Sequence, residues 1–365
     1  MTQSRLPEPV PSEPIIRLLS VAVRAGASDV HLIGGFPPSL RLHGNLVQLE
    51  APPLDAAWLH DLLNCFCTEH MVQRLHEEKG LDFAFALNLD DQRIRFRANL
   101  FYAGRQLGAC LRIIPARIPD FGWAEFPIEL ARRLAACRDG MIVVTGPAGS
   151  GKTTTLAMIV NLINQAGGQR IITIEEPLEY EFPRASSSVV TQREVGIDVP
   201  TFADGLKYGL RQDPDVILVG EIRDYETAQI ALSAAETGHL VFTTLHTRDA
   251  KGAISRYADL FPHEAQRDVR SQLALSLRAI IAQRLLPDIE PGQKCHLALE
   301  ILWNTFPIAS AIRVGKLESI DNYLTTSRED GMVSFDESVR RLFEDSRISR
   351  TIAEQNVRDP SVLGR

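Results

Sequence analysis

The chain has 365 residues, of which 45% are hydrophobic and 23% charged, and its formal net charge is −7. This length favours two domains with buried cores, and the composition is typical of a soluble globular protein. The acidic balance provides no overall positive field, which argues against a nucleic-acid partner, and no apolar run approaches the ~20 residues of a membrane span.

The first part of the chain predicts a flexible leader followed by a small α+β domain. Residues 1–14 carry four prolines and no apolar core of a signal peptide, so we expect them to be flexible. Over residues 15–114, the hydrophobic spacing alternates between helical and extended periods. The expected elements are a helix over 15–25, short strands near 30–32 and 40–42, a helix over about 56–78, and strands over 82–89, 94–101 and 108–114.

Residues 115–127 are rich in proline and predict a semi-rigid linker between two domains. Over residues 128–262, short apolar runs rich in β-branched residues alternate with segments of helical spacing. This alternation predicts a parallel sheet buried on both faces, within an α/β domain of the P-loop type. For residues 263–365 we expect a helical C-terminal extension. The apolar runs are 141–145, 170–174, 216–219 and 240–244.

Residues 146–153, Gly-Pro-Ala-Gly-Ser-Gly-Lys-Thr, match the phosphate-binding P-loop pattern. The match follows an apolar strand and precedes a helical segment, a context that a chance glycine-rich turn would lack. We expect Lys152 to reach the β- and γ-phosphates of ATP, and the Thr153 hydroxyl to bind Mg²⁺ together with waters. The residues expected to bind the nucleotide are Gly146, Pro147, Ala148, Gly149, Ser150, Gly151, Lys152, Thr153 and Thr154.

A second apolar strand, within residues 213–221, ends in the carboxylate of Glu221. Beside the P-loop strand, this carboxylate would lie near the γ-phosphate, where it is suited to orient or deprotonate the attacking water. Walker B strands usually end in an aspartate where this chain has Gly220. We therefore expect Thr153 and waters to bind Mg²⁺ directly, with Glu221 as the catalytic base or bound to a water of the metal. The alternative is a surface glutamate at a strand end.

The segment 174–180, Ile-Glu-Glu-Pro-Leu-Glu-Tyr, places three acids within five residues at the end of another strand. Such crowding is unfavourable unless a cation lies near. Glu175 and Glu179 are therefore candidates for the metal or its water network, and an acidic turn is the alternative.

Two further groups are candidates for contact with the nucleotide. His239 and His246 lie at the two ends of the strand within 237–247, which suggests γ-phosphate sensing, whereas core packing is the alternative. On the N-terminal strand within 93–97, alternation places the arginines on one face. Arg95, Arg97 and Arg112 form either a solvated basic face or a clamp that reaches the nucleotide across a domain or subunit boundary, as an arginine finger does.

Together these segments resemble the secretion ATPase superfamily, and most closely the PilT-like retraction ATPases of type IV pili. The resemblance spans nearly the whole chain, and its motifs follow one another in the same order. The matching segments are 26–32, 95–97, the P-loop, the acidic segment 174–180 (the Asp box of the family), 192–195, 218–224 (Walker B), and 234–239 through 245–247 (the His box).

The resemblance implies a PAS-like N-terminal domain over 15–114, a RecA-like ATPase domain, and a homohexameric ring with ATP between subunits. It also implies a cytoplasmic protein at the inner face of the cytoplasmic membrane, associated only through partners such as the inner-membrane platform protein of a pilus or secretion machine. By motif, the family roles pass to Lys152 and Thr153 for phosphate and Mg²⁺, Glu221 as catalytic glutamate, Glu175 and Glu179, His239 and His246, and Arg95, Arg97 and Arg112.

Two features bear on which machine such a protein would drive. The extra N-terminal domain and the tetracysteine zinc motif of pilus-assembly relatives are not found in this sequence, which favours the retraction branch. The segment 307–314, however, keeps only Ile308, Ile312 and Arg313 of the retraction motif Ala-Ile-Arg-Asn-Leu-Ile-Arg-Glu. The alternatives are an energising ATPase of a type II or type IV-like secretion system, a RecA-type nucleic-acid motor, and a catalytically silent ring member.

Overall fold

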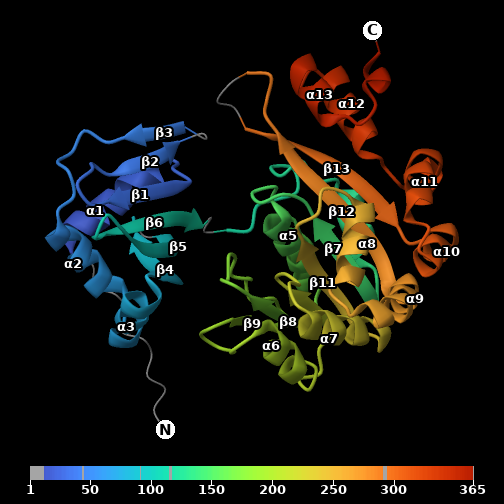
Figure 1. Ribbon diagram of the computed structural model, residues 1–365, viewed down its shortest axis with the longest axis horizontal. Helices are drawn as coiled ribbons and strands as arrows, with labels where there is room; N and C mark the ends of the chain where they lie inside the picture. The colour runs from blue at the N-terminus through green and yellow to red at the C-terminus, as the bar shows by residue number, and fades with distance from the viewer. Residues whose placement is uncertain (1–11, 43–44, 91, 115–116, 291–293, 365) are drawn as a thin grey trace. The chain divides into compact units, whose positions relative to one another are not determined.

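A computed structural model describes residues 12–42, 45–90, 92–114, 117–290 and 294–364. The chain forms two compact units, Met1–Arg117 and Ile118–Arg365 (Figure 1). The division falls within the expected linker 115–127. Most of the expected leader, residues 1–11, lies outside the described residues.

The first unit is an antiparallel six-stranded sheet with strand order β3-β2-β1-β6-β5-β4, accompanied by three helices. Apolar side chains of α1, including Ile15, Leu19 and Ala22, are fully buried in its core. The strands expected near 30–32 and 40–42 and over 82–89, 94–101 and 108–114 are confirmed, whereas β3 is a strand that the sequence did not predict. The elements are α1 (Glu13–Arg24), β1 (Asp29–Ile33), β2 (Ser39–Leu42), β3 (Asn45–Gln48), α2 (Ala56–Phe66), α3 (Glu69–Glu78), β4 (Gly80–Leu89), β5 (Gln92–Ala103) and β6 (Gln106–Ile114).

The single helix expected over about 56–78 is wrong, because the chain breaks into α2 and α3 at Cys67 and Thr68. Cys67 is extended, and the Thr68 hydroxyl accepts a hydrogen bond from the Met71 amide at 3.3 Å. A threonine that caps a helix in this way starts a new helix rather than continuing the old one.

The second unit is built on a seven-stranded sheet with strand order β13-β12-β7-β11-β10-β8-β9. All neighbouring pairs are parallel except β12 and β13. The central strands β7, β10 and β11 are buried at every position, as the apolar runs predicted. The strands are β7 (Gly140–Thr145), β8 (Arg170–Glu175), β9 (Val189–Glu194), β10 (Val216–Val219), β11 (Leu240–Leu245), β12 (Leu277–Leu286) and β13 (His296–Trp303).

Helices connect most of these strands, and further helices follow β13 (Figure 1). The helices are α4 (Ile128–Ala135), α5 (Lys152–Ala166), α6 (Phe202–Gly209), α7 (Tyr225–Glu236), α8 (Ala250–Asp259), α9 (Gln266–Ser276), α10 (Phe306–Val314), α11 (Ile320–Thr326), α12 (Phe335–Glu344) and α13 (Arg350–Asn356), with short 3₁₀ turns η1 (His263–Ala265), η2 (Leu317–Ser319), η3 (Arg328–Asp330) and η4 (Pro360–Leu363).

The expectation that residues 263–365 are a helical extension is wrong over β12 and β13. β12 pairs with β7 in parallel, and β13 closes that side of the sheet in antiparallel pairing, so the core sheet continues to Trp303. Short apolar runs do not by themselves distinguish a buried strand from a buried helix, which is why periodicity missed both. The helical part begins at α10, and α12, α13 and η4 share a small core of their own with Leu286 and Ala298.

Candidate active site

The P-loop joins the carboxyl end of β7 to the start of α5. Gly146 has φ +149°, and a Cβ there would lie 2.3 Å from the Gln283 carbonyl oxygen of β12, so only glycine fits. The Gln283 side chain also donates to the Ser150 carbonyl oxygen at 2.5 Å. The neighbouring strand β12 therefore braces the loop from one side, and Gln283 is a contact of the P-loop that the sequence analysis missed.

Lys152 lies folded over this loop and is buried, with 7% of its surface exposed. Its Nζ donates to the carbonyl oxygens of Gly146 at 3.0 Å and Pro147 at 2.9 Å. Burial lowers the pKa of Lys152, while the charges of Glu221 and Glu179 act in the opposite direction. The structure therefore brings the P-loop lysine together with two of the predicted acids.

Glu221 follows the end of β10 and is 9% exposed. Its Oε2 lies 3.1 Å from His246 Nε2, and its Oε1 lies 2.5 Å from an Arg223 Nη atom. The preceding residue is tightly held, because the Gly220 amide donates to the Ile174 carbonyl and the Gly220 carbonyl accepts from the Thr244 hydroxyl at 2.6 Å. The carboxylate is thus fixed from two directions. Arg223 is a second position that the sequence analysis missed.

The acidic segment after β8 is organised by a residue of β9. The side-chain Nε2 of Gln192 donates to the Tyr180 carbonyl oxygen at 2.7 Å and to Glu175 Oε1 at 3.4 Å. Tyr180 is buried, which raises its pKa, and its hydroxyl lies 2.9 Å from the Thr154 hydroxyl of α5. This contact ties the acidic segment to the helix that carries Lys152 and Thr153.

Within one chain, the structure brings only one of the two candidate histidines to this site, and whether His239 contacts a nucleotide stays a prediction. His246 follows the carboxyl end of β11, beside Glu221. His239 precedes the strand, its carbonyl accepts from the Gly140 amide, and its Nδ1 lies 3.0 Å from the Ala234 carbonyl. Gly140 begins β7, whereas the P-loop follows its end, so a full strand length separates His239 from the phosphate-binding loop.

The three arginines of the first unit lie on one face of its sheet. Arg95 and Arg97 alternate with the buried Phe96 on β5, and Arg97 pairs with Arg112 of β6. Arg112 Nε donates to Asp29 Oδ1 at 2.9 Å. Whether these side chains reach a nucleotide stays a prediction, because they belong to the other unit.

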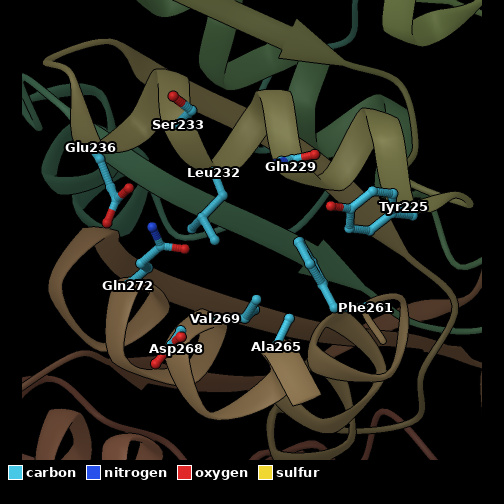
Figure 2. A pocket seen from close by; sticks show the side chains of 10 residues that line it. All are labelled: Tyr225, Gln229, Leu232, Ser233, Glu236, Phe261, Ala265, Asp268, Val269 and Gln272. Atoms are coloured by element: carbon cyan, nitrogen blue, oxygen red, sulfur yellow. The ribbon is translucent and has the colours of Figure 1, made fainter. Parts of the chain in front are cut away.

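A separate pocket of about 260 Å³ lies between α7 and α9 (Figure 2). Tyr225 and Phe261 form one end of it, in an edge-to-face contact with centroids 5.2 Å apart. Glu236, Asp268 and Gln272 gather at the other end. None of its lining residues belongs to the P-loop or to the acids around it, so this pocket is not the nucleotide site.

The arrangement around Lys152 and Glu221 is suited to binding a nucleotide phosphate and activating a water, and comparison with known proteins agrees. A family profile described as "Type II/IV secretion system protein" matches residues 9–311. The chain belongs to this family. In the family, the type IV pilus retraction ATPase PilT of Pseudomonas aeruginosa is 37% identical over 349 residues, covering 95% of this chain and 98% of PilT. An uncharacterized Escherichia coli protein, YggR, is 38% identical over 331 residues, covering 91% of this chain and 98% of YggR.

Among solved structures, a crystal structure of the pilus retraction motor PilT with bound ADP superimposes with a TM-score of 0.84. The two chains are 41% identical, and the match covers 95% of this chain and 97% of that one. This chain is therefore a PilT-like ATP hydrolase that binds nucleotide, with the α/β fold of that motor, in a family of pilus retraction and secretion ATPases. The PAS-like character of the first unit stays a prediction. Among the described residues, no helix is long and apolar enough to cross a bilayer.

The residues at the P-loop also fit a magnesium ion. The described residues contain no cluster of three or more histidine, cysteine or acidic side chains that could hold a metal. Mg²⁺ retains several waters and takes few protein ligands when nucleotide phosphates complete its coordination. The Thr153 hydroxyl can supply one such protein ligand. Glu221 and Glu179, whose charges raise the pKa of the neighbouring Lys152, can bind the waters of the ion.

Proposed function

We propose that this protein is a homohexameric ATPase that powers retraction of a type IV pilus, or of a closely related pilus-type machine, from the cytoplasmic face of the inner membrane. The observation that carries the proposal is the contact of Glu221 with His246 at 3.1 Å, next to a P-loop lysine in a PilT-like chain. Association with the membrane would be indirect, through an inner-membrane platform protein.

The chain's own residues suggest how hydrolysis proceeds. Lys152 exchanges the carbonyls of Gly146 and Pro147 for the β- and γ-phosphates of ATP. Thr153 would hold Mg²⁺, which neutralises developing phosphate charge. Glu221 orients the attacking water and accepts its proton, while His246 keeps the carboxylate aimed. Positioning and charge stabilisation account for most of the acceleration in phosphoryl transfer.

The proposed ring would give the three candidate arginines of the first unit a role at the nucleotide. Arg95, Arg97 and Arg112 share one face of the other unit, and we propose that they complete the site across a subunit boundary. An arginine supplied in this way accelerates phosphoryl transfer by about 10³–10⁵-fold.

The second candidate is the energising ATPase of a secretion system, and α10 favours it. At the position of the last glutamate of the retraction motif this helix carries Val314, 62% exposed, and its first residue, Phe306, is 86% exposed. A surface that is apolar where retraction motors are charged would bind a different partner.

Deleting the gene and measuring twitching motility tests the proposal. We expect twitching to be lost, to be restored by the parental gene, and to stay lost with the K152A variant. Intact twitching with loss of protein secretion would favour the secretion ATPase instead, and DNA-stimulated hydrolysis would indicate a nucleic-acid motor.

A further inference from the structure

Arg358, in the connection between α13 and η4, contacts carboxylates from three other elements of the second unit. Its guanidinium lies 2.5 Å from Asp249, 2.9 Å from Asp321 of α11, and 3.9 Å from Glu300 of β13. Arg358 belongs to none of the nucleotide-binding motifs. It is 109 residues away from Asp249 in sequence.

The arginine is held in place at its backbone as well as at its head. Its amide donates to Asp336 Oδ1 of α12 at 2.8 Å, and the next amide, of Asp359, donates to Asp336 Oδ2 at 3.1 Å. Burial tends to lower the pKa of Arg358, but the charges of Glu300, Asp249 and Asp321 outweigh burial and raise this pKa. A fixed, permanently charged side chain therefore faces the cluster of carboxylates.

Two of these carboxylates shape the start of α8. Asp249 caps the helix, accepting from the Gly252 amide at 2.7 Å. Glu300, only 2% exposed, accepts from the Ala250 amide at 2.8 Å, and its burial raises its pKa. Without the positive charge of Arg358, the negative charges of Asp249, Glu300 and Asp321 would be less neutralised, and these carboxylates would repel one another.

The start of α8 is directly connected to the active site. Asp249 lies three residues after His246, and between them the Thr247 amide donates to the Thr145 hydroxyl at 2.9 Å. Thr145 is the residue that precedes the P-loop. The segment 246–250 is thus fastened to β7 at Thr247 and to Arg358 and Glu300 at its other end.

We propose that Arg358 is a positioning residue for ATP hydrolysis, which keeps His246 on Glu221 by fixing Asp249 and the first turn of α8. The inference rests on the proposed roles of His246 and Glu221. It assigns to the C-terminal segment an indirect part in turnover, because the residues after α13 hold the loop that carries His246.

Steady-state hydrolysis by full-length variants tests the assignment. R358Q should lower kcat about 10-fold while KM for ATP changes by less than about twofold, because small displacements of a catalytic group reduce turnover more than binding. R358K keeps the charge but not the forked geometry, and should lose about threefold. Since it keeps the charge, it provides the test if R358Q does not fold.

The matched control is R350Q, which removes an arginine of the same C-terminal region that pairs with Glu354 and Gly364 and does not contact 246–250. R350Q should keep the parental kcat. A parental kcat in R358Q, or an equal loss in R350Q, would overturn the proposal.

A double-mutant cycle with His246 separates this inference from the function on which it rests. If Arg358 acts through His246, R358Q should cause little further loss in the H246A background. An unchanged kcat in H246A alone would remove the premise, and a full, multiplicative loss in the double variant would exclude this route. Limited trypsin digestion reports on the loop itself: cleavage after the exposed Arg248 should be faster in R358Q than in R350Q, and equal rates would contradict the proposal.

Discussion

The two ends of β11 each carry a histidine, but their surroundings differ. At the carboxyl end, His246 contacts Glu221, which follows β10, and Thr247 bonds to the last residue of β7. At the amino end, His239 bonds to local backbone and lines an open groove of about 710 Å³ between the end of α5 and the α4–β7 connection. Strand polarity, more than residue type, decides where chemistry is assembled, because the loops that follow parallel strands meet at one edge.

The largest effect on hydrolysis is expected for substitution of Glu221, which His246 contacts at the carboxyl end of β11. E221Q keeps the shape of the side chain but cannot accept a proton, so kcat should fall about 10²–10⁴-fold while ATP still binds. Hydrolysis and the binding of a fluorescent ATP analogue measure the two properties. Parental turnover in E221Q would mean that another group is the base.

Replacing each histidine separately tests the comparison between the two ends of β11. H246A removes a hydrogen bond to a charged group and should lower kcat about 10-fold, whereas H239A should change it less than about twofold. Both variants are measured in the same hydrolysis assay with saturating ATP. Equal losses in the two variants would show that the amino end of β11 also serves the reaction.

A smaller effect is expected at Arg223, which is 65% exposed and lies 2.5 Å from Glu221 Oε1. Exposed ion pairs contribute little, so R223Q should lower kcat about two- to fivefold with KM nearly unchanged, and R223K should recover part of the loss. A loss as large as that of E221Q would show that Arg223 itself contacts the transferred phosphate.

The smallest effect is expected at Glu125, whose ion pairs with Lys294 and His296 stabilise the fold. Burial tends to raise the pKa of the Glu125 carboxyl, but hydrogen bonds from Lys294 and His296 lower that pKa to about 2. A carboxylate with a depressed pKa stabilises the fold above its unfolded pKa of about 4.3 and loses that contribution as pH falls toward 2. E125Q should therefore be about 1 kcal/mol less stable than the parent at pH 6 and nearly equal to it at pH 2, measured by urea unfolding. A difference that is constant with pH would assign the loss to packing.

The sequence predicted the parts of the site that are local in the chain. The P-loop, Glu221 and the strands that carry them follow from apolar runs and glycine spacing within single segments. Gln283 and Arg358 could not be found in this way, since each acts on a loop more than a hundred residues away and their significance depends on strand pairing and helix packing. Glutamine and arginine in such contexts carry no distinguishing pattern.

The differences have equally specific causes. His239 and His246 bracket one strand in the sequence, but a six-residue strand spans about 20 Å, so only one of them lies at the carboxyl end within one chain. β12 and β13 are short apolar runs, which periodicity alone does not distinguish from buried helices. Cys67 and Thr68 interrupt a helical pattern that periodicity alone continues.

The position of Lys152 has a consequence for how the enzyme empties its site. Its two hydrogen bonds to the carbonyls of Gly146 and Pro147 are satisfied within the loop, so an arriving phosphate replaces existing bonds rather than filling an unpaired ammonium group. Part of the attraction between Lys152 and a phosphate is thereby offset by the two hydrogen bonds that the lysine gives up, which lowers the affinity for ADP as well as for ATP and so favours release of the product.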